Sequence, residues 1–438
     1  MTSTQVDKPV PIVRLVIGSA GGGNRWLLLA LAAVFVFAGL ASVAVTRPSQ
    51  GDVWLTFALW LAGAAGATLI LKLRLPAHDP LLLALPLFLS GWGLVAIERL
   101  APSFADRQAL WLVISVLAML AVASFPHPLR WLRSYRYSLL AAALLLLLAT
   151  IALGRNPSGF EFAPRLWLSF GSFYFQPSEL MKVILVAFMA TYLAEQTVAI
   201  RAGSEAAGGD MAASPRLIGP MLLMWLLSMV VLVWQRDLGT AMLFFIVFMI
   251  LLYLASGDRR IIIGGVALIL VAGLAAYHLF DVVQLRVDIW LNPWPEADGR
   301  AYQIVQSLMA FGAGGIFGAG VAQGYPGYIP VVHSDFVFAA IAEEWGLLGV
   351  IGILSCLGVL AWRGLSIALT HPGAAFHKLL AVAITMTLLV QALMIMAGVL
   401  KLLPLTGVTL PFISYGGSSL LACHVMIGLL LRLSTGAR

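Results

Sequence analysis

The stretch GTAMLFFIVFMILLYLAS, residues 239–256, runs for eighteen positions without a charged side chain. At a rise of about 1.5 Å per residue, a helix of this length crosses most of the roughly 30 Å hydrocarbon layer of a bilayer. Backbone amides find no water in hydrocarbon, so a helix is the economical way to satisfy them. The stretch therefore predicts a membrane-spanning helix.

Comparable apolar segments recur along the whole chain. Of its 438 residues 61% are hydrophobic and only 10% are charged, against about 25% charged in ordinary soluble domains. The predicted fold class is therefore an all-α polytopic membrane protein, without alternating strand patterns. We expect twelve spanning helices, near 26–46, 53–73, 80–98, 109–126, 138–154, 178–197, 216–234, 239–256, 260–279, 336–362, 379–401 and 410–432.

The positive charges predict an orientation. With a cytoplasmic N-terminus, sixteen Lys and Arg residues fall on the cytoplasmic side and nine on the outer side, so both termini are expected in the cytoplasm. Residues 1–25 read as a polar tail before a retained first helix. The long connection 281–335 then lies outside, and its aromatic residues favour an ordered element at the membrane interface.

Composition also limits the partners. The net charge of +7 is scattered between apolar segments without a basic run, so nucleic acid is not an expected partner and membrane lipids are. Cys356 and Cys423 each lie in an apolar segment, where a thiol packs as a small hydrophobe. We expect neither a disulfide framework nor a cysteine metal site.

Ionisable residues near membrane segments are candidate functional groups, because burying them costs several kcal/mol unless they are paired or wet. Glu179 and Lys182 are three residues apart and share a helix face, so they could form a structural ion pair behind a Ser178 cap, or the wall of a substrate cavity. Arg236 and Asp237 have two equally good interpretations. They could form an ion pair within a tight turn, or Arg236 could bind phosphate.

Asp335 lies where the long outer connection enters the tenth predicted helix. Partial desolvation there would raise its pKa toward that of a useful base, whereas a plain helix cap is the alternative. Glu343 and Glu344 follow about two helical turns later and need partners such as Lys182 or Arg236.

Two further stretches are rich in small residues. Glycines recur over residues 312–320, which indicates flexible backbone or close approach to a ligand. Residues 414–419, SYGGSS, interrupt the last apolar segment, and either helix packing or a helix broken beside a cavity explains them. His278 and His424 lack metal-ligand spacing.

Taken in order, several of these blocks resemble the SEDS family (shape, elongation, division and sporulation), the RodA and FtsW group. The resemblance covers about residues 80–432. The matching blocks are RLWL at 165–168, FQPSELMK at 175–182, QRDLGT at 235–240, NPW at 292–294, YQIVQS at 302–307, GG at 314–315, HSDF at 333–336, AEE at 342–344 and SYGGS at 414–418.

The resemblance implies a peptidoglycan glycosyltransferase in the bacterial cytoplasmic (inner) membrane. It would polymerise lipid II into glycan strands on the outer face, release undecaprenyl pyrophosphate, and work with a class B penicillin-binding protein in elongation or division. Asp335 would be the general base for the acceptor 4-hydroxyl, and the resemblance leaves room for a divalent cation (Mg or Mn) at the leaving group. The implied substrate-binding residues are Trp167, Glu179, Lys182, Arg236, Asp237, His333, Glu343 and Ser414.

Departures from the family concern the N-terminus and the outer loop. Members commonly have ten membrane helices, so residues 26–73 would add two to a family domain at 74–438. The usual Leu-Pro-Glu reads Ile329-Pro330-Val331, and a frequent Lys is Ala319. A lipid II flippase and a non-catalytic scaffold for a penicillin-binding protein are the alternative functions.

Overall fold

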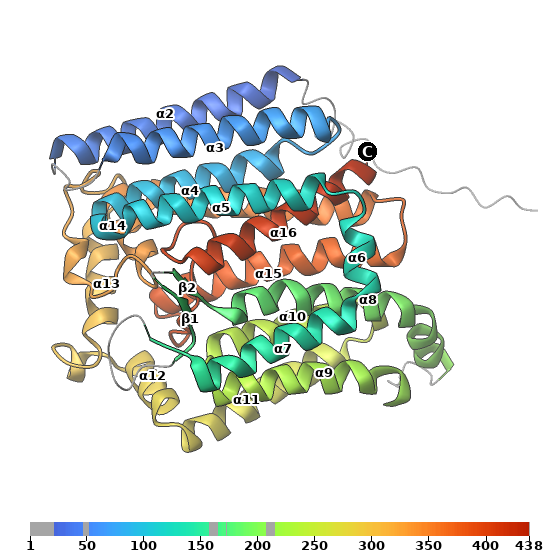
Figure 1. The fold of residues 1–438 in the computed structure, drawn as a ribbon. Helices are drawn as coiled ribbons and strands as arrows, with labels where there is room; N and C mark the ends of the chain where they lie inside the picture. Colours follow the sequence, from blue (N-terminus) through green and yellow to red (C-terminus); the bar gives the residue numbers. More distant parts are fainter. Residues whose placement is uncertain (1–21, 47–51, 157–164, 172, 207–214, 438) are drawn as a thin grey trace, which may run out of the picture.

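The structure is a computed structural model that describes residues 22–46, 52–156, 165–171, 173–206 and 215–437 (Figure 1). Within these residues, eleven helices are long and apolar enough to cross a membrane. Most of the expected tail, 1–25, lies outside the described residues. The eleven are α2 (Gly22–Thr46), α3 (Val53–Arg74), α4 (Leu81–Leu100), α5 (Ala105–Ser124), α7 (Arg136–Leu153), α8 (Pro177–Ala206), α10 (Leu238–Ser256), α11 (Arg260–Leu279), α14 (Val337–Thr370), α15 (Ala375–Val399) and α16 (Gly417–Gly436).

The all-α polytopic fold is thus confirmed, while the count of twelve stays a prediction. The expected segment 216–234 coincides with α9 (Pro215–Trp234), whose described apolar part, Met221–Trp234, is shorter than the other spans. Two short helices lie between spans, η1 (Pro102–Phe104) and α6 (Pro128–Ser134).

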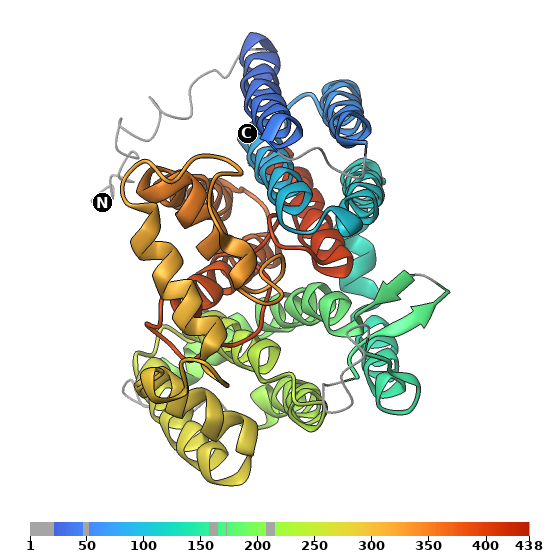
Figure 2. The same ribbon diagram turned by 90° about the vertical axis from the view of Figure 1, so that its left-hand side faces the viewer.

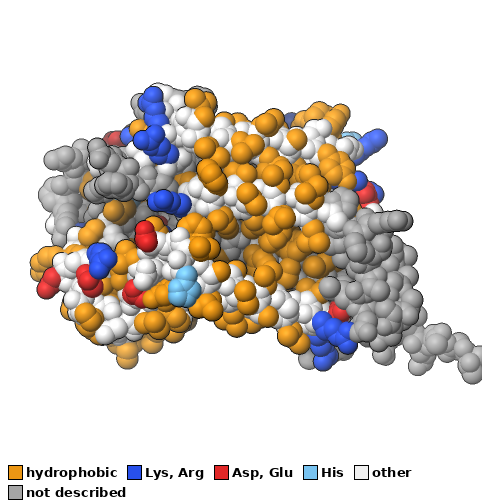
Figure 3. All heavy atoms as spheres, turned by 90° about the horizontal axis from the view of Figure 1, so that it is seen from below, with side chains coloured by type: hydrophobic (Ala, Val, Ile, Leu, Met, Phe, Trp, Pro, Cys, Tyr) orange, Lys and Arg blue, Asp and Glu red, His pale blue; other side chains and the backbone are white. Residues whose placement is uncertain are grey.

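The outer surface of the bundle is apolar along its middle. Seen from below, hydrophobic side chains form a belt and the charged side chains gather toward the two ends (Figure 3). On α11, Ile263, Leu270 and Leu279 are 69%, 68% and 75% exposed. An apolar surface this extensive would be unstable in water, so lipid is its natural solvent.

The connection 281–335 is ordered, as its aromatic residues indicated. It contains α12 (Asp281–Leu291), η2 (Trp294–Glu296), α13 (Tyr302–Gly314) and η3 (Pro326–Tyr328). In Figure 1, α12 and α13 lie at one end of the bundle and the C-terminus at the other.

A small hairpin at the α12 end was not expected from the sequence. Strands β1 (Leu168–Phe170) and β2 (Phe173–Phe175) pair antiparallel, with Leu168 opposite Phe175. Three residues per strand are too few for an alternating pattern to be recognised.

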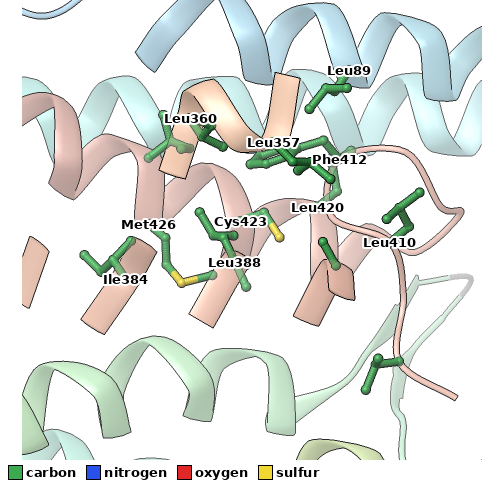
Figure 4. Close-up of a cluster of buried hydrophobic side chains, with 14 of the residues drawn as sticks. Leu89, Leu357, Leu360, Ile384, Leu388, Leu410, Phe412, Leu420, Cys423 and Met426 are labelled. Atoms are coloured by element: carbon green, nitrogen blue, oxygen red, sulfur yellow. The ribbon is translucent and has the colours of Figure 1, made fainter. Parts of the chain in front are cut away.

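The centre of the bundle contains a large apolar core. Figure 4 shows Leu357 of α14 and Leu388 of α15 around Cys423 and Met426 of α16. Cys423 is fully buried and both cysteines are free, so the thiols pack as hydrophobic groups, as predicted.

Helix α14 is broken at Gly346, whose φ is 63° and ψ −162°. The break frees backbone groups that residues 315–320 then satisfy. The amides of Ala319 and Gly320 donate to the carbonyls of Glu343 and Glu344, at 2.8 and 3.0 Å, and the amide of Leu347 donates to Gly315 at 3.0 Å. The glycine-rich stretch therefore supplies close backbone pairing inside the protein, which membrane proteins require wherever a helix is interrupted.

The partner of Glu344 is Arg99 of α4, so the expected pairing with Lys182 or Arg236 is wrong. Arg99 Nε lies 2.8 Å from Glu344 Oε1, and both side chains are almost fully buried. Arg99 Nη2 also donates to the carbonyl of Gly324 at 2.8 Å. The two charges come from segments 245 residues apart, which no local spacing could have indicated.

The remaining carboxylate oxygens hold the adjacent loop. Glu344 Oε2 accepts from the amide of Ala322 at 3.0 Å, and Glu343 Oε1 accepts from the amide of Tyr325 at 2.7 Å. Glu343 and Glu344 therefore fasten residues 322–325 to the first half of α14.

The two N-terminal helices lie at one edge of the bundle, where α2 packs on α4 and α3 packs mainly on α5 and also contacts α4 (Figure 2). Trp60 Nε1 of α3 donates to the carbonyl of Leu87 at 2.9 Å, and the hydroxyl of Thr56 donates to Glu98 Oε1 at 2.7 Å. A Cβ on Gly91 would lie 2.8 Å from Trp60 Nε1, so only glycine permits this approach. The hairpin α2–α3 is thereby an integral part of the bundle.

We expect Arg99→Ala to destabilise the protein strongly, by roughly 3–5 kcal/mol, because Glu344 would stay buried without its cation. The measurement is thermal unfolding of the purified protein in detergent. The double variant Arg99→Met, Glu344→Met serves as control and should recover most of the loss. Equal losses in the single and double variants would contradict the pairing.

Candidate active site

An open cavity of about 240 Å³ lies at the α12 end of the bundle. Helices α12 and α13, the residues before α14, and the segment 398–407 form its walls. Asp335 is the acidic residue of its described lining, and the basic residues are Arg286, Arg300 and Lys401. One carboxylate among three cations suits a ligand with several negative charges.

Asp335 faces this cavity and does not cap α14. The helix begins at Val337, and its N-cap position is Phe336. The described hydrogen bond of the Asp335 carboxylate comes from the Ser334 hydroxyl, at 3.1 Å from Oδ1. The simple cap reading of Asp335 is therefore wrong.

Arg286 of α12 is the cation next to Asp335. A Cβ placed on Gly407 would lie 3.8 Å from both Arg286 Nη2 and Asp335 Oδ2, so this glycine sits between the two charged groups. Its φ of +73° disfavours any other residue. Arg286 Nη1 also donates to the carbonyl of Thr406 at 3.4 Å, which ties α12 to the same loop.

Burial raises the pKa of the Asp335 carboxyl above its ordinary value, while the Ser334 hydroxyl and the charge of Arg286 oppose this rise. Burial likewise lowers the pKa of Arg286, and the charges of Asp335 and Asp237 oppose that change. A carboxylate that is partly desolvated but still stabilised by a cation has the properties of a general base.

Asp237 is a second carboxylate that acts on Arg286. Its Oδ1 accepts from the amide of Thr240 at 3.2 Å and caps α10, and its Oδ2 accepts from the Ser178 hydroxyl at 3.1 Å. Among the described contacts Asp237 has no ion pair with Arg236, whose side chain is exposed and whose φ is 61°. The expected pair within the turn is therefore wrong.

Ser414 and His333 connect the segment 401–416 to the Asp335 block. The Ser414 hydroxyl donates to the carbonyl of Ser334 at 2.7 Å and accepts from the amide of Leu410 at 2.9 Å. The amide of Tyr415 donates to the carbonyl of His333 at 2.9 Å. Residues 414–416 lie in the non-helical segment before α16, and residues 417–419 form the first turn of that helix.

The His333 ring packs between two aromatic rings. Its centroid lies 5.1 Å from that of Phe104 and 5.6 Å from that of Tyr415. Burial lowers its pKa, so the neutral imidazole is favoured there.

Glu179 and Lys182 form the expected ion pair, with Lys182 Nζ 2.5 Å from Glu179 Oε2. Lys182 also donates to Gln391 Oε1 at 2.9 Å, and Gln391 Nε2 donates to the carbonyl of Thr409 at 2.8 Å. The buried pair thus supports the segment 401–416 from inside the bundle. Ser178 cannot be the cap, since α8 already begins at Pro177.

The structure separates the predicted site residues into groups. Asp335 lines the cavity, while Asp237, Ser414 and His333 adjoin its wall through the contacts above. Glu179, Lys182 and Glu343 make internal contacts instead. Trp167 exchanges backbone hydrogen bonds with Arg155 beside the hairpin, at 2.7 and 3.3 Å.

Sequence reasoning missed Arg286, Arg300 and Lys401 as site residues. In the sequence they are three of the nine positive charges on the expected outer side. Lys and Arg usually favour the cytoplasmic side, so positive charges on the outer side are an exception. That exception is the feature of the sequence that could have marked these three residues as functional.

The described residues contain no group of three or more His, Cys, Asp or Glu side chains placed to hold a metal ion. Asp335 and Asp237 flank Arg286 rather than a common centre. The described donors therefore do not form a metal site built from protein ligands alone, and the chemistry below is derived for protein groups.

Comparison with known proteins identifies the family. Residues 87–438 match the family described as cell cycle protein, which comprises FtsW, RodA and SpoVE. Peptidoglycan glycosyltransferase RodA of Mycobacterium tuberculosis is 37% identical, over 94% of this chain and 90% of that protein. Stage V sporulation protein E of Bacillus subtilis is 32% identical, over 76% of this chain and 90% of that protein.

Solved structures agree. One from a study of the structural coordination of polymerization and crosslinking by a peptidoglycan synthase complex is 29% identical, with a TM-score of 0.66 over 82% of this chain and 97% of that chain. Rod shape determining protein RodA of Thermus thermophilus is 27% identical, with a TM-score of 0.58 over 82% and 96%. With most of its length matched in both sequence and structure, the chain belongs to the FtsW, RodA and SpoVE family of multi-pass membrane proteins.

Proposed function

We propose that this protein is a peptidoglycan glycosyltransferase that polymerises lipid II on the outer face of the bacterial cytoplasmic membrane, in elongation or division. Relatives that carry the name peptidoglycan glycosyltransferase support the activity. The single observation that carries the mechanism is Asp335, desolvated beside Arg286 in an open cavity at one end of the bundle.

In the proposed reaction, Asp335 takes the proton of the acceptor 4-hydroxyl. The hydroxyl oxygen then forms a bond with the anomeric carbon of the growing strand, and the bond from that carbon to the pyrophosphate oxygen breaks. The proton ends on the carboxyl group and the bonding electrons leave with undecaprenyl pyrophosphate. Burial, which raises the pKa of Asp335, improves it as a proton acceptor near neutral pH.

The leaving group gains negative charge as this bond breaks. Arg286, Arg300 and Lys401 line the same cavity and could stabilise that charge, because guanidinium and ammonium groups bind phosphate oxygens strongly. Trp290 and several aliphatic residues complete the lining and suit a lipid-linked substrate. Trp167, Glu179, Lys182, Arg236, Asp237, His333, Glu343 and Ser414 are proposed to bind substrate directly or to hold the walls of its site.

The positive charge distribution supports cytoplasmic termini and an outward-facing cavity. A class B penicillin-binding protein is the proposed partner, since one structural relative comes from a complex that coordinates polymerization with crosslinking. We propose that α2 and α3, which precede the family match at residue 87, are additions to a family domain at 74–438.

Asp335→Asn should lower the rate of lipid II polymerisation by at least about 100-fold, because a positioned general base contributes on that scale. The measurement is strand length and yield from labelled lipid II with the purified protein, with and without its partner. Thermal stability should fall little, since the amide keeps the shape of the carboxylate and Asp237 still faces Arg286. Asp281→Asn, at an exposed aspartate of α12, is the matched control and should keep full activity.

Undiminished polymer from the Asp335 variant would refute its role as the base. Translocation of lipid II without polymer would identify a flippase instead. If the purified protein makes no polymer, and the Asp335 variant impairs cell wall synthesis only because it no longer binds its partner, the protein is a scaffold.

The rate should fall on acidification at a higher pH than an ordinary aspartate would give, because the carboxylate must be deprotonated and burial raises its pKa. Arg286 opposes that rise, so Arg286→Gln should move the acid limb of the profile to still higher pH. The measurement is the initial rate of polymerisation against pH. The guanidinium of Arg300 pairs with Glu296, so Arg300→Gln should leave the acid limb in place. If the acid limb shifts in both variants, or in neither of them, the assignment is contradicted.

A further inference from the structure

A short amphipathic helix crosses the opposite end of the bundle from the candidate active site. In Figure 1, α6 runs across the direction of the spanning helices. Leu129 and Leu132 pack against the core, whereas Arg130, Trp131 and Arg133 are exposed. A helix with an apolar inner face and an outer face of Arg and Trp is typical of the plane where lipid headgroups lie.

Beside α6 lies a wide, open cavity of about 500 Å³, formed with the first turn of α7 and with α8. Its lining includes the guanidinium groups of Arg130, Arg133 and Arg136. Glu195 is its one described carboxylate, 2.6 Å from Arg136 Nη1 and 3.5 Å from Arg133 Nη2. Three positive charges against one negative charge leave an excess of two, which fits an anionic ligand.

The surroundings of the cavity are aromatic and then apolar. Phe125, Trp131 and Tyr135 are exposed, and their rings pack in sequence at centroid distances of 5.7 Å. Such rings favour the boundary between headgroups and hydrocarbon. Beyond them, Leu145 and Leu148 of α7 are exposed along the spanning face. The site therefore offers positive charge at the interface and an apolar track leading into the membrane.

We propose that this cavity binds the headgroup phosphate of an anionic phospholipid, whose acyl chains lie along α7. Guanidinium groups bind phosphate oxygens in pairs, and Arg130 and Arg133 are one turn apart on the same outer face. Glu195 holds Arg136 in place and leaves Arg130 for the ligand. The site is independent of the glycan chemistry at the other end of the bundle.

The test compares a lipid of net negative charge with a zwitterionic lipid whose choline cation balances its phosphate. Purified protein is titrated in detergent with phosphatidylglycerol or with phosphatidylcholine of the same acyl chains, and Tm is followed. We expect a saturable rise in Tm with phosphatidylglycerol and none with phosphatidylcholine. Arg130→Gln with Arg133→Gln should weaken the apparent Kd by at least about tenfold.

Matched variants separate this site from general charge effects. Arg259→Gln removes an exposed charge just before α11 and should leave the titration unchanged, and Arg130→Lys with Arg133→Lys should retain part of the binding. An equal effect of Arg259→Gln would overturn the proposal. So would an equal rise in Tm with inorganic phosphate, which would reassign the cavity to free anions.

A separate set of contacts joins the extra helix α2 to α14, the helix that begins just after the candidate base. The Phe35 ring of α2 stacks on Trp345 of α14, at a centroid distance of 4.9 Å and an angle of 26°. Phe35 also contacts Phe88 and Trp92 of α4, at 4.9 and 5.0 Å. Trp345 directly precedes the break in α14.

The same helix reaches the loop that closes this break. The Ser42 hydroxyl donates to the carbonyl of Val321 at 3.4 Å, next to the residues held by Glu343 and Glu344. Residues 337–345 form a short rigid rod, with Asp335 just before its start and Trp345 at its end. Contacts from α2 therefore act on the far end of the element that places Asp335.

We infer that α2 positions the first half of α14, and Phe35 is the positioning residue; this inference rests on the proposed function. Phe35→Ala should lower kcat for lipid II polymerisation by about tenfold or more with little change in KM, because misplacement of a reacting group affects the chemical step. Phe35→Trp, which keeps a stacking ring, should restore kcat.

The matched control is Phe37→Ala. Phe37 is half-exposed and packs on Trp54 and Phe57 within the hairpin, at 5.6 and 5.5 Å. Phe37→Ala should therefore lower Tm but leave kcat nearly unchanged. If the unmodified protein is active, an unchanged kcat in Phe35→Ala would overturn this inference alone. An equal loss of kcat in Phe35→Ala and Phe37→Ala would do the same. An unmodified protein that makes no polymer would overturn the proposed function.

Discussion

The structure depends on one constraint: backbone polar groups inside the bundle must find partners in the protein, because lipid supplies none. Both irregular segments near the candidate site meet this demand. Residues 315–320 pair with the carbonyls exposed by the break at Gly346. The segment 401–416 is held through the Ser414 hydroxyl, which bonds to both Leu410 and Ser334. The site can therefore contain irregular backbone and remain rigid.

Electrostatics adds a second level of organisation to this frame. Buried ion pairs are fully internal, as with Arg99 and Glu344 or Glu179 and Lys182, and they fix loops to helices. Arg286 instead faces two carboxylates, and one of them opens onto a cavity. Charged groups that are paired within the protein thus stabilise the loops and helices around the site. Asp335, which is open to the cavity, is available to react.

The sequence predicts what depends on local spacing. Uninterrupted apolar runs predicted the helices, and the spacing of three residues predicted the Glu179–Lys182 pair. It could not predict Arg99 as the partner of Glu344 or Arg286 as the neighbour of Asp335, because tertiary packing alone brings those groups together. Asp335 stands out in the sequence because a carboxylate at a membrane boundary is costly. The family resemblance then assigns it the role of the base.

The hairpin of α2 and α3 also changes which residues α4 can carry. An 18-residue window of α4 is 78% buried, against 33% in either covering helix, and Glu98 lies beneath that cover, where it accepts a hydrogen bond from the Thr56 hydroxyl of α3. In direct contact with acyl chains, the same carboxyl group would be strongly unfavourable. A chain with a carboxyl group under this hairpin cannot lose the hairpin unless that group is replaced as well. The covering helices and the residue beneath them are therefore expected to be kept or lost together in evolution.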